Sequence, residues 1–156
     1  MGEEEHIRTF VTAIGRVSVV TDGYTVRAVY LPSENLPAME EGTDPVMEQA
    51  EKEIGEYLAG KRKVFDVPLS IEGTDFAVDI LTAMTGIPYG STVTYGELAE
   101  RAGHPGAYRA AGTVCRNNRI PIIIPCHRVV ASDGLGQYAG GTALKQRLLT
   151  IEREYR

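Results

Sequence analysis

The spacing of the apolar residues changes near residues 61–74, and this change limits the folds that the chain can form. Residues 7–32 alternate in the manner of β-strands, with Asp22-Gly23 as a typical two-residue hairpin turn. Residues 43–60 repeat their apolar positions at helical spacing, with Pro45 near the start and Gly60 at the end. We therefore expect a small antiparallel sheet and one amphipathic helix in the first part.

Helical periodicity dominates the second part of the chain. Thr94 and Glu97 form a capping box for a short helix that ends at Gly103, and Pro105 suits the first turn of the next. Two short helices about three residues apart are typical of a helix-turn-helix, although ordinary helical hairpins share the pattern. We expect an α+β fold with an N-terminal sheet and helix domain (1–63), a linker (64–74), and a mostly helical C-terminal domain (75–156) with the helix-turn-helix.

The segment after the second of these helices differs in character. Residues 121–125, PIIIP, are interpreted as a buried strand. A glycine-rich loop follows over 132–141, and Thr142 is expected to cap a final helix that ends near Glu154.

The charge of the chain is divided unevenly between its two parts. The net charge of −5 argues against binding to nucleic acid, but residues 1–85 carry a balance of −9 and residues 86–156 a balance of +4. The strongly charged side chains within 105–119 are all arginines: Arg109, Arg116 and Arg119. This cationic stretch fits either a solvated helix face or a surface that binds phosphate.

Cellular location and cysteine chemistry are also constrained. The longest apolar runs are far shorter than the roughly 20 residues that cross a bilayer, and the acidic start differs from a basic signal sequence, so we expect a cytoplasmic protein. Cys115 and Cys126 are eleven residues apart, which favours free thiols over a disulfide framework. His6 stands alone in the first 63 residues, and we predict no metal.

Cys126, His127 and Arg128 follow one another directly after the apolar run. A cysteine attacks as the thiolate, so a reactive one needs a base or a positive neighbour that lowers its pKa. A Cys-His pair is, however, more often a structural cysteine beside a surface histidine. Spacing alone leaves both interpretations open.

A longer stretch around this pair carries more information. RNNRIPIIIPCHRVVAS (116–132) resembles the active-site signature of the O6-alkylguanine-DNA alkyltransferases, also called methylated-DNA-protein-cysteine methyltransferases. FDVPLSIEGTDF, IPYGSTVTYGELAERAG, AYRAAGTVCRNN and GQYAGGTALKQRLLTIE are similar to other segments of that family. The resemblance covers about residues 64–154.

The resemblance implies a single-use alkyl acceptor. Cys126 takes an alkyl group from O6 of guanine in DNA and forms a thioether, which does not hydrolyse, and no cofactor is needed. Glu152 orients His127, which reaches Cys126 through a water. Tyr95 and Lys145 supply a proton or hydrogen bond to the departing guanine. Asn118 ties the recognition helix to the active-site strand, and it also suits a helix cap.

The resemblance also implies how DNA is bound. The partner is double-stranded DNA with an alkylated guanine, which must be flipped out of the helix to be reached. Arg109 fills the vacated place, and Tyr95 lies beside the target phosphate. Small residues let the second helix approach the minor groove: Ala110, Ala111 and Gly112. Arg116 and Arg119 add positive charge, and the guanine pocket is formed by Val129, Tyr138, Ala139 and Gly140. The protein is expected to act as a monomer, away from membranes.

The sequence departs from the family at several positions. Ala139 stands where many relatives have serine, Asp79-Ile80 replaces a Val-Trp pair, and Arg119 replaces a proline, which leaves the packing and breadth of the pocket open. Two rival functions are a non-catalytic lesion-binding protein and a thiol hydrolase. Retention of Cys126 with His127 and Glu152 argues against the first, and the helix-turn-helix with Arg109 is unexplained by the second. Cys115 is expected to be a packed thiol without an adjacent base.

Overall fold

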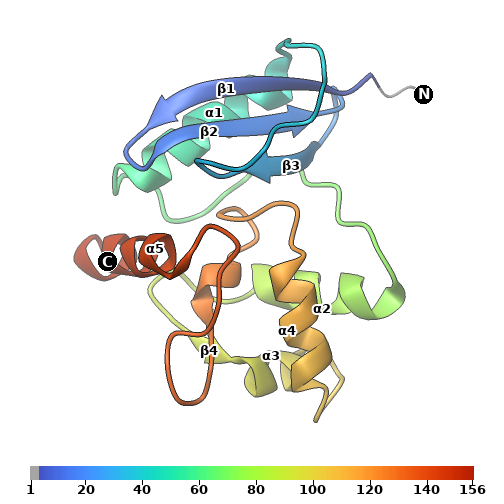
Figure 1. Cartoon of the computed structure of the whole chain (residues 1–156), viewed down its shortest axis with the longest axis vertical. Helices are drawn as coiled ribbons and strands as arrows, with labels where there is room; N and C mark the ends of the chain where they lie inside the picture. The colour runs from blue at the N-terminus through green and yellow to red at the C-terminus, as the bar shows by residue number, and fades with distance from the viewer. Residues whose placement is uncertain (1–3) are drawn as a thin grey trace. The chain divides into compact units, whose positions relative to one another are not determined.

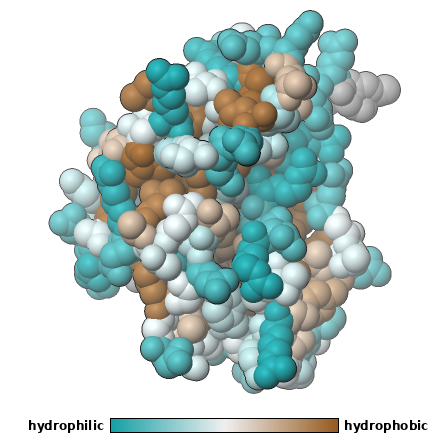
Figure 2. All heavy atoms as spheres, viewed as in Figure 1, coloured by the Kyte–Doolittle hydropathy of each residue, from teal (hydrophilic) through white to brown (hydrophobic). Residues whose placement is uncertain are grey.

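The computed structural model describes residues 4–156 and has the expected α+β fold (Figure 1). The chain divides into two compact units. The first contains the residues up to Ser70 together with 119–121, and the second contains 71–118 and 122–156. Buried apolar side chains form the cores, and hydrophilic residues occupy much of the face shown in Figure 2.

Three antiparallel strands form the sheet of the first unit, in the order β1-β2-β3: β1 His6–Thr12, β2 Gly15–Thr21 and β3 Val26–Tyr30. The two-residue turn predicted at Asp22-Gly23 is wrong, because Thr21 pairs with Val26 and four residues connect β2 to β3. The Asp22 carboxylate accepts hydrogen bonds from the backbone N–H groups of Tyr24 (2.9 Å) and Thr25 (2.7 Å), which stabilises this wider turn.

Helix α1, Pro45–Leu58, lies along the sheet as expected (Figure 1). The Asp44 carboxylate caps its start by accepting from the Met47 N–H (2.7 Å), and Pro45 occupies the first turn. Its buried face also contains Glu53, which is 2% exposed. Glu53 accepts from the backbone N–H groups of Asp66 (2.9 Å) and Val67 (3.1 Å), so it holds the segment that leaves the helix.

Two segments cover the outer edge of β3. The Val26 N–H donates to the Pro68 carbonyl (2.9 Å), and the Ser70 N–H donates back to Val26 (3.0 Å). The Val29 N–H donates to the carbonyl of Arg119 (2.9 Å). These bonds satisfy edge groups that would otherwise be open to another chain.

The second unit contains four α-helices: α2 Asp75–Thr85, α3 Tyr95–Arg101, α4 Tyr108–Arg116 and α5 Thr142–Glu154. The capping box of Thr94 and Glu97 at α3 is confirmed. A short parallel pair, β4 Val93–Thr94 with β5 Val129–Val130, was not predicted. Two residues per strand are too few to show a periodicity. Within residues 4–156 no helix combines the length and apolar character needed to span a membrane.

The helix-turn-helix is formed by α3 and α4, which pack against each other. Gly103 ends α3 with a φ of 87°, and the His104 N–H donates to the Ala99 carbonyl (2.9 Å). The start predicted for α4 is wrong. Pro105 lies in a turn closed by a bond from the Ala107 N–H to His104 (3.1 Å), Gly106 has a φ of 86°, and the helix begins only at Tyr108.

The predicted strand over 121–125 is also wrong. The segment forms turns, with Ile122 at a φ of 74°, an unusual backbone conformation for a β-branched residue. Pro121 and Pro125 lack the N–H that a ladder needs. Because the segment is buried, its apolar composition resembled that of a buried strand.

The predicted cap of α5 needs a similar correction. Thr142 is the first residue of the helix, and Gly141, with a φ of 94°, occupies the cap position without a side-chain bond. The predicted end of α5 at Glu154 is confirmed.

Candidate active site

Cys126 begins a 3-10 turn, η1 Cys126–Arg128, instead of following a strand. The Cys126 N–H donates to the Ile124 carbonyl (2.8 Å), and the Asn118 side-chain amide donates to the same carbonyl (2.9 Å). Asn118 also hydrogen-bonds the Cys126 side chain. The amide therefore joins the end of α4 to the turn that contains the sulfur. Cys126 is buried, with an exposed fraction of 5%.

The turn brings His127 against Glu152 of α5. The distance from His127 Nε2 to Glu152 Oε2 is 2.8 Å, and the two residues are 0% and 1% exposed. A carboxylate only accepts hydrogen bonds, so Nε2 carries the proton and the Nδ1 lone pair is the basic position of the imidazole. The structure thus brings together the histidine and glutamate that the sequence suggested.

Burial determines the charge state of the resting pair. Burial raises the pKa of the Cys126 thiol, and this effect outweighs the Asn118 hydrogen bond and the positive charge of Lys145, which both lower it. Burial also lowers the pKa of His127, against the opposing effect of Glu152. The resting protein therefore lacks the lowered thiol pKa that a thiolate nucleophile needs, and a neutral thiol stands next to a neutral imidazole.

Lys145 is a fully buried cation on the same helix as Glu152. Its Nζ donates to the carbonyls of Val129 (2.6 Å) and Gln137 (3.1 Å), which ties β5 to the glycine-rich loop. Burial lowers the pKa of Lys145, and the Cys126 side chain lies within electrostatic range of it. The ammonium group is thus a better acid than an exposed lysine.

Tyr95, at the start of α3, and Lys145 both lie close to Gly136. A Cβ atom placed on Gly136 would lie 2.9 Å from the Tyr95 hydroxyl and 3.3 Å from Lys145 Nζ. Burial raises the pKa of Tyr95, which also forms a hydrogen bond with the Gln137 backbone. Tyr95 therefore keeps its O–H as a donor at neutral pH.

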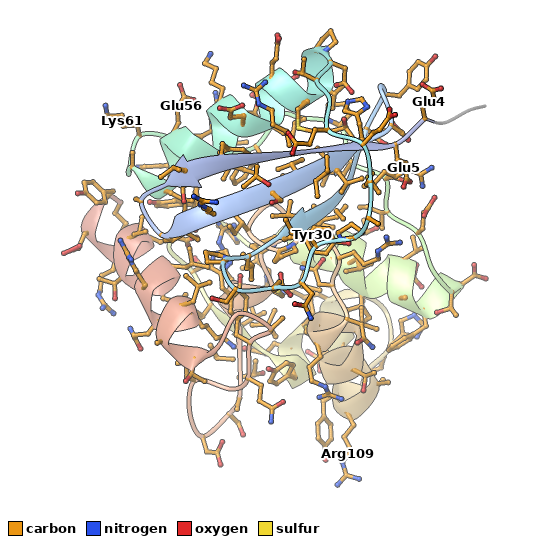
Figure 3. The ribbon with its side chains drawn as sticks, turned by 45° about the horizontal axis from the view of Figure 1, so that its top comes forward. Glu4, Glu5, Tyr30, Glu56, Lys61 and Arg109 are labelled. Carbon is orange, nitrogen blue, oxygen red and sulfur yellow. The ribbon has the colours of Figure 1, made fainter. Side chains whose placement is uncertain are left out.

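A cleft of about 460 Å³ opens beside these residues. It is lined by Tyr95, Tyr108, Arg109, Gly112, Thr113, Arg116, Ala131, Gly136 and Gln137. Its lining therefore combines Tyr95 and Gly136 with two cationic side chains of α4, Arg109 and Arg116. Arg109 is exposed, and Figure 3 shows its side chain extending away from the ribbon.

Several predicted site residues lie elsewhere. Ala111 is 0% exposed and packs inward, so its predicted contact with DNA is wrong. Arg119 belongs to the first unit. The four residues predicted for the guanine pocket are outside the lining of this cleft. Val129 is fully buried, Tyr138 stacks edge-on against His127 (6.5 Å between ring centroids), and Ala139 and Gly140 lie further along the loop.

Sequence reasoning missed the contacts that Arg128, Gly90 and Gly136 make in the site. The Arg128 guanidinium and the Gly90 N–H both bind Glu152, and Gly136 gives Tyr95 and Lys145 their space. Arg128 stands within the Cys-His-Arg run, but its direction depends on a turn that was taken for a strand. Among residues 4–156, no group of three or more His, Cys, Asp or Glu side chains is placed to hold a metal ion.

A Gly136→Ala variant is expected to lower the free energy of unfolding by about 1–3 kcal/mol, because alanine is strained at a φ of 78° and its methyl group collides with Tyr95. Thermal denaturation measures the change. Gly134→Ala, in the same loop, is the matched control, because a Cβ atom there meets nothing within 4 Å. Equal stability of the two variants would contradict the packing described for Gly136.

Comparison with known proteins gives a consistent result. Residues 75–154 match the model of the family described as 6-O-methylguanine DNA methyltransferase, DNA binding domain. The chain is 40% identical over 150 residues to the methylated-DNA–protein-cysteine methyltransferase of Mycolicibacterium paratuberculosis, covering 92% of this chain and 86% of the relative. It is 34% identical to the constitutive enzyme of that name from Bacillus subtilis, covering 91% and 92%.

Solved structures give the same result at the level of the fold. The crystal structure of Mycobacterium tuberculosis OGT in complex with DNA is similar with a TM-score of 0.89 and 35% identity, covering 96% of this chain and 94% of that one. The O6-methylguanine-DNA methyltransferase of Pyrococcus kodakaraensis is similar with a TM-score of 0.68 and 26% identity, covering 95% and 98%.

Proposed function

Because the chain belongs to the 6-O-methylguanine DNA methyltransferase family, we propose that it repairs DNA by transferring the alkyl group of O6-alkylguanine to its own Cys126. The observation that carries this proposal is the buried contact of 2.8 Å between His127 and Glu152, directly beside a buried thiol. A structural cysteine needs no such pair. The relay of Cys126, a water, His127 and Glu152 follows the same order of nucleophile, base and orienting carboxylate as other sets of this kind.

The transfer is a single nucleophilic displacement at the alkyl carbon. The thiol proton passes to His127 Nδ1, the sulfur attacks the alkyl carbon, and the bond from that carbon to guanine O6 breaks. The electron pair leaves with the guanine, which Tyr95 or Lys145 stabilises by a hydrogen bond and which takes up one proton, in balance with the proton that His127 has removed from the thiol. Glu152 stabilises the imidazolium while it exists. The products are restored guanine and a thioether on Cys126, and the protein is consumed.

The neutral resting state has a functional consequence. A protonated thiol is a poor nucleophile, so Cys126 becomes reactive only when His127 removes its proton. Cys115 has no comparable arrangement, and burial raises its pKa to about 12. It is therefore a packed thiol and not a second acceptor.

Double-stranded DNA with an alkylated guanine is the proposed partner of the monomeric protein. The helix-turn-helix presents Arg109 and Arg116 on the exposed side of α4, next to the cleft. A paired guanine must leave the duplex before its O6 group reaches a buried sulfur. Arg109 takes the place of the flipped guanine in the base stack, while Ala110 and Gly112 allow α4 to approach the minor groove closely. Tyr95 lies beside the target phosphate.

The number of guanines restored by each protein molecule tests this function against its rivals. With excess O6-methylguanine duplex, we expect one guanine restored per molecule, followed by no further reaction, because the thioether does not hydrolyse. A lesion-binding protein would restore none. A hydrolase would continue to turn over, and either result would overturn the proposal.

A further inference from the structure

We infer that Arg128 is a positioning residue of the transfer reaction, which keeps His127 ready to accept the thiol proton by acting through Glu152. This inference rests on the proposed function.

Arg128 is held at the centre of the buried group and is 6% exposed. Its Nε lies 3.0 Å from both Glu152 oxygens, and its Nη2 lies 3.0 Å from Oε2. Its Nη1 donates to the Ile87 carbonyl (2.8 Å), and the guanidinium carbon lies 5.6 Å from the Tyr89 ring centroid. This arrangement uses the planar fork of arginine, which a lysine ammonium cannot reproduce.

Glu152 is consequently fixed from three directions. The Gly90 N–H donates to Oε1 (2.8 Å), Arg128 contacts both oxygens, and His127 Nε2 lies 2.8 Å from Oε2. The carboxylate has little freedom to rotate, and Oε2 is shared between the guanidinium and the imidazole. The direction of His127, and so of its Nδ1 atom, depends on this shared oxygen.

The charges around His127 explain why the sharing matters. Glu152 and Lys145 face it from α5, Cys126 and Arg128 belong to its own turn, and Tyr138 packs on it from the glycine-rich loop. Glu152 alone favours the imidazolium, in which Nδ1 already carries a proton and cannot accept another. Arg128 offsets that negative charge, and together with burial it keeps the pKa of His127 low.

Removal of the positive charge of Arg128 therefore has a predictable effect on the pH dependence. With Glu152 no longer offset, the pKa of His127 rises, and the imidazole is blocked over a wider range of acidic pH. As the pH is lowered, the transfer rate of the variant should therefore begin to fall at a higher pH than that of the unaltered protein. Above the raised pKa, the imidazole is neutral again, and the loss of rate that remains there reflects the missing fork, as it does for a lysine.

The test measures single-turnover rate constants for methyl transfer from excess O6-methylguanine duplex between pH 5 and 9. Arg128→Gln should move the acidic limb of the profile upward by about one pH unit, which is about tenfold in rate at pH values below the limb. Arg128→Lys retains the charge, so its limb should stay in place while its plateau falls by about tenfold through loss of the fork. Arg153→Gln, an exposed change on the same helix, should alter neither.

The reaction amplitude counts the folded molecules, so the rate constant reports the chemistry even where a variant is less stable. An unchanged profile for Arg128→Gln, or the same upward shift for Arg128→Lys, would overturn the inference. If Arg128→Gln does not fold, an upward shift in Arg128→Lys alone overturns it. Failure of the unaltered protein to form S-methylcysteine would instead contradict the proposed function.

Discussion

A Cys126→Ser variant is expected to lose alkyl transfer completely while it keeps its affinity for DNA. A serine hydroxyl is far less acidic than a thiol and is a far weaker nucleophile toward an alkyl carbon. The exchange of sulfur for oxygen changes the size of the side chain only slightly, and the proposed DNA-binding residues lie on α3 and α4. The affinity for DNA should therefore be kept. Guanine restoration and equilibrium binding at several salt concentrations measure the two properties separately, and the binding should weaken as salt rises.

Cys115→Ser is the matched control, because it makes the same substitution at the second buried thiol. This variant should still restore one guanine per molecule. Residual transfer by Cys126→Ser would mean that another group accepts the alkyl. Loss of DNA binding by Cys126→Ser would contradict the assignment of Cys126 to alkyl transfer alone.

An Arg109→Ala variant is expected to repair paired DNA on the order of a hundredfold more slowly. Opening the duplex costs a few kcal/mol, and the side chain that fills the stack offsets part of this cost. Transfer from the free O6-methylguanine base needs no opening, so its rate should hardly change. Single-turnover rates with the two substrates give the comparison.

Arg153→Ala provides the control for loss of one exposed arginine outside the helix-turn-helix. It should leave both rates within about twofold, because a single surface charge contributes little. Equal slowing of the two substrates by Arg109→Ala would contradict the role of this arginine in the stack.

Much of the fold was predictable because its signals are local. The capping box of Thr94 and Glu97 specifies the start of α3 through two hydrogen bonds within four residues. Asp44, Pro45 and the apolar positions of α1 define that helix in the same way. The turn over 121–125 was not predictable, because burial there depends on distant packing, and an apolar run looks the same in a strand and in a buried turn.

The site shows the same difference between features with a local signal in the sequence and contacts between distant residues. Cys126, His127 and Glu152 were found from the sequence, and the structure brings the latter two into contact. The contacts of Arg128 and Gly90 with Glu152 join residues 24 and 62 positions apart, and no local pattern encodes them. The raised pKa of the thiol was missed for a related reason, since the sequence shows the charged neighbours but not how completely the sulfur is buried.

Peptide mass mapping after reaction with an O6-methylguanine duplex tests the central claim most directly. We predict one added methyl group on the peptide that contains Cys126 and an unmodified peptide for Cys115. Restored guanine with an unmodified Cys126 would contradict the account, as would a methyl group found on Cys115 instead.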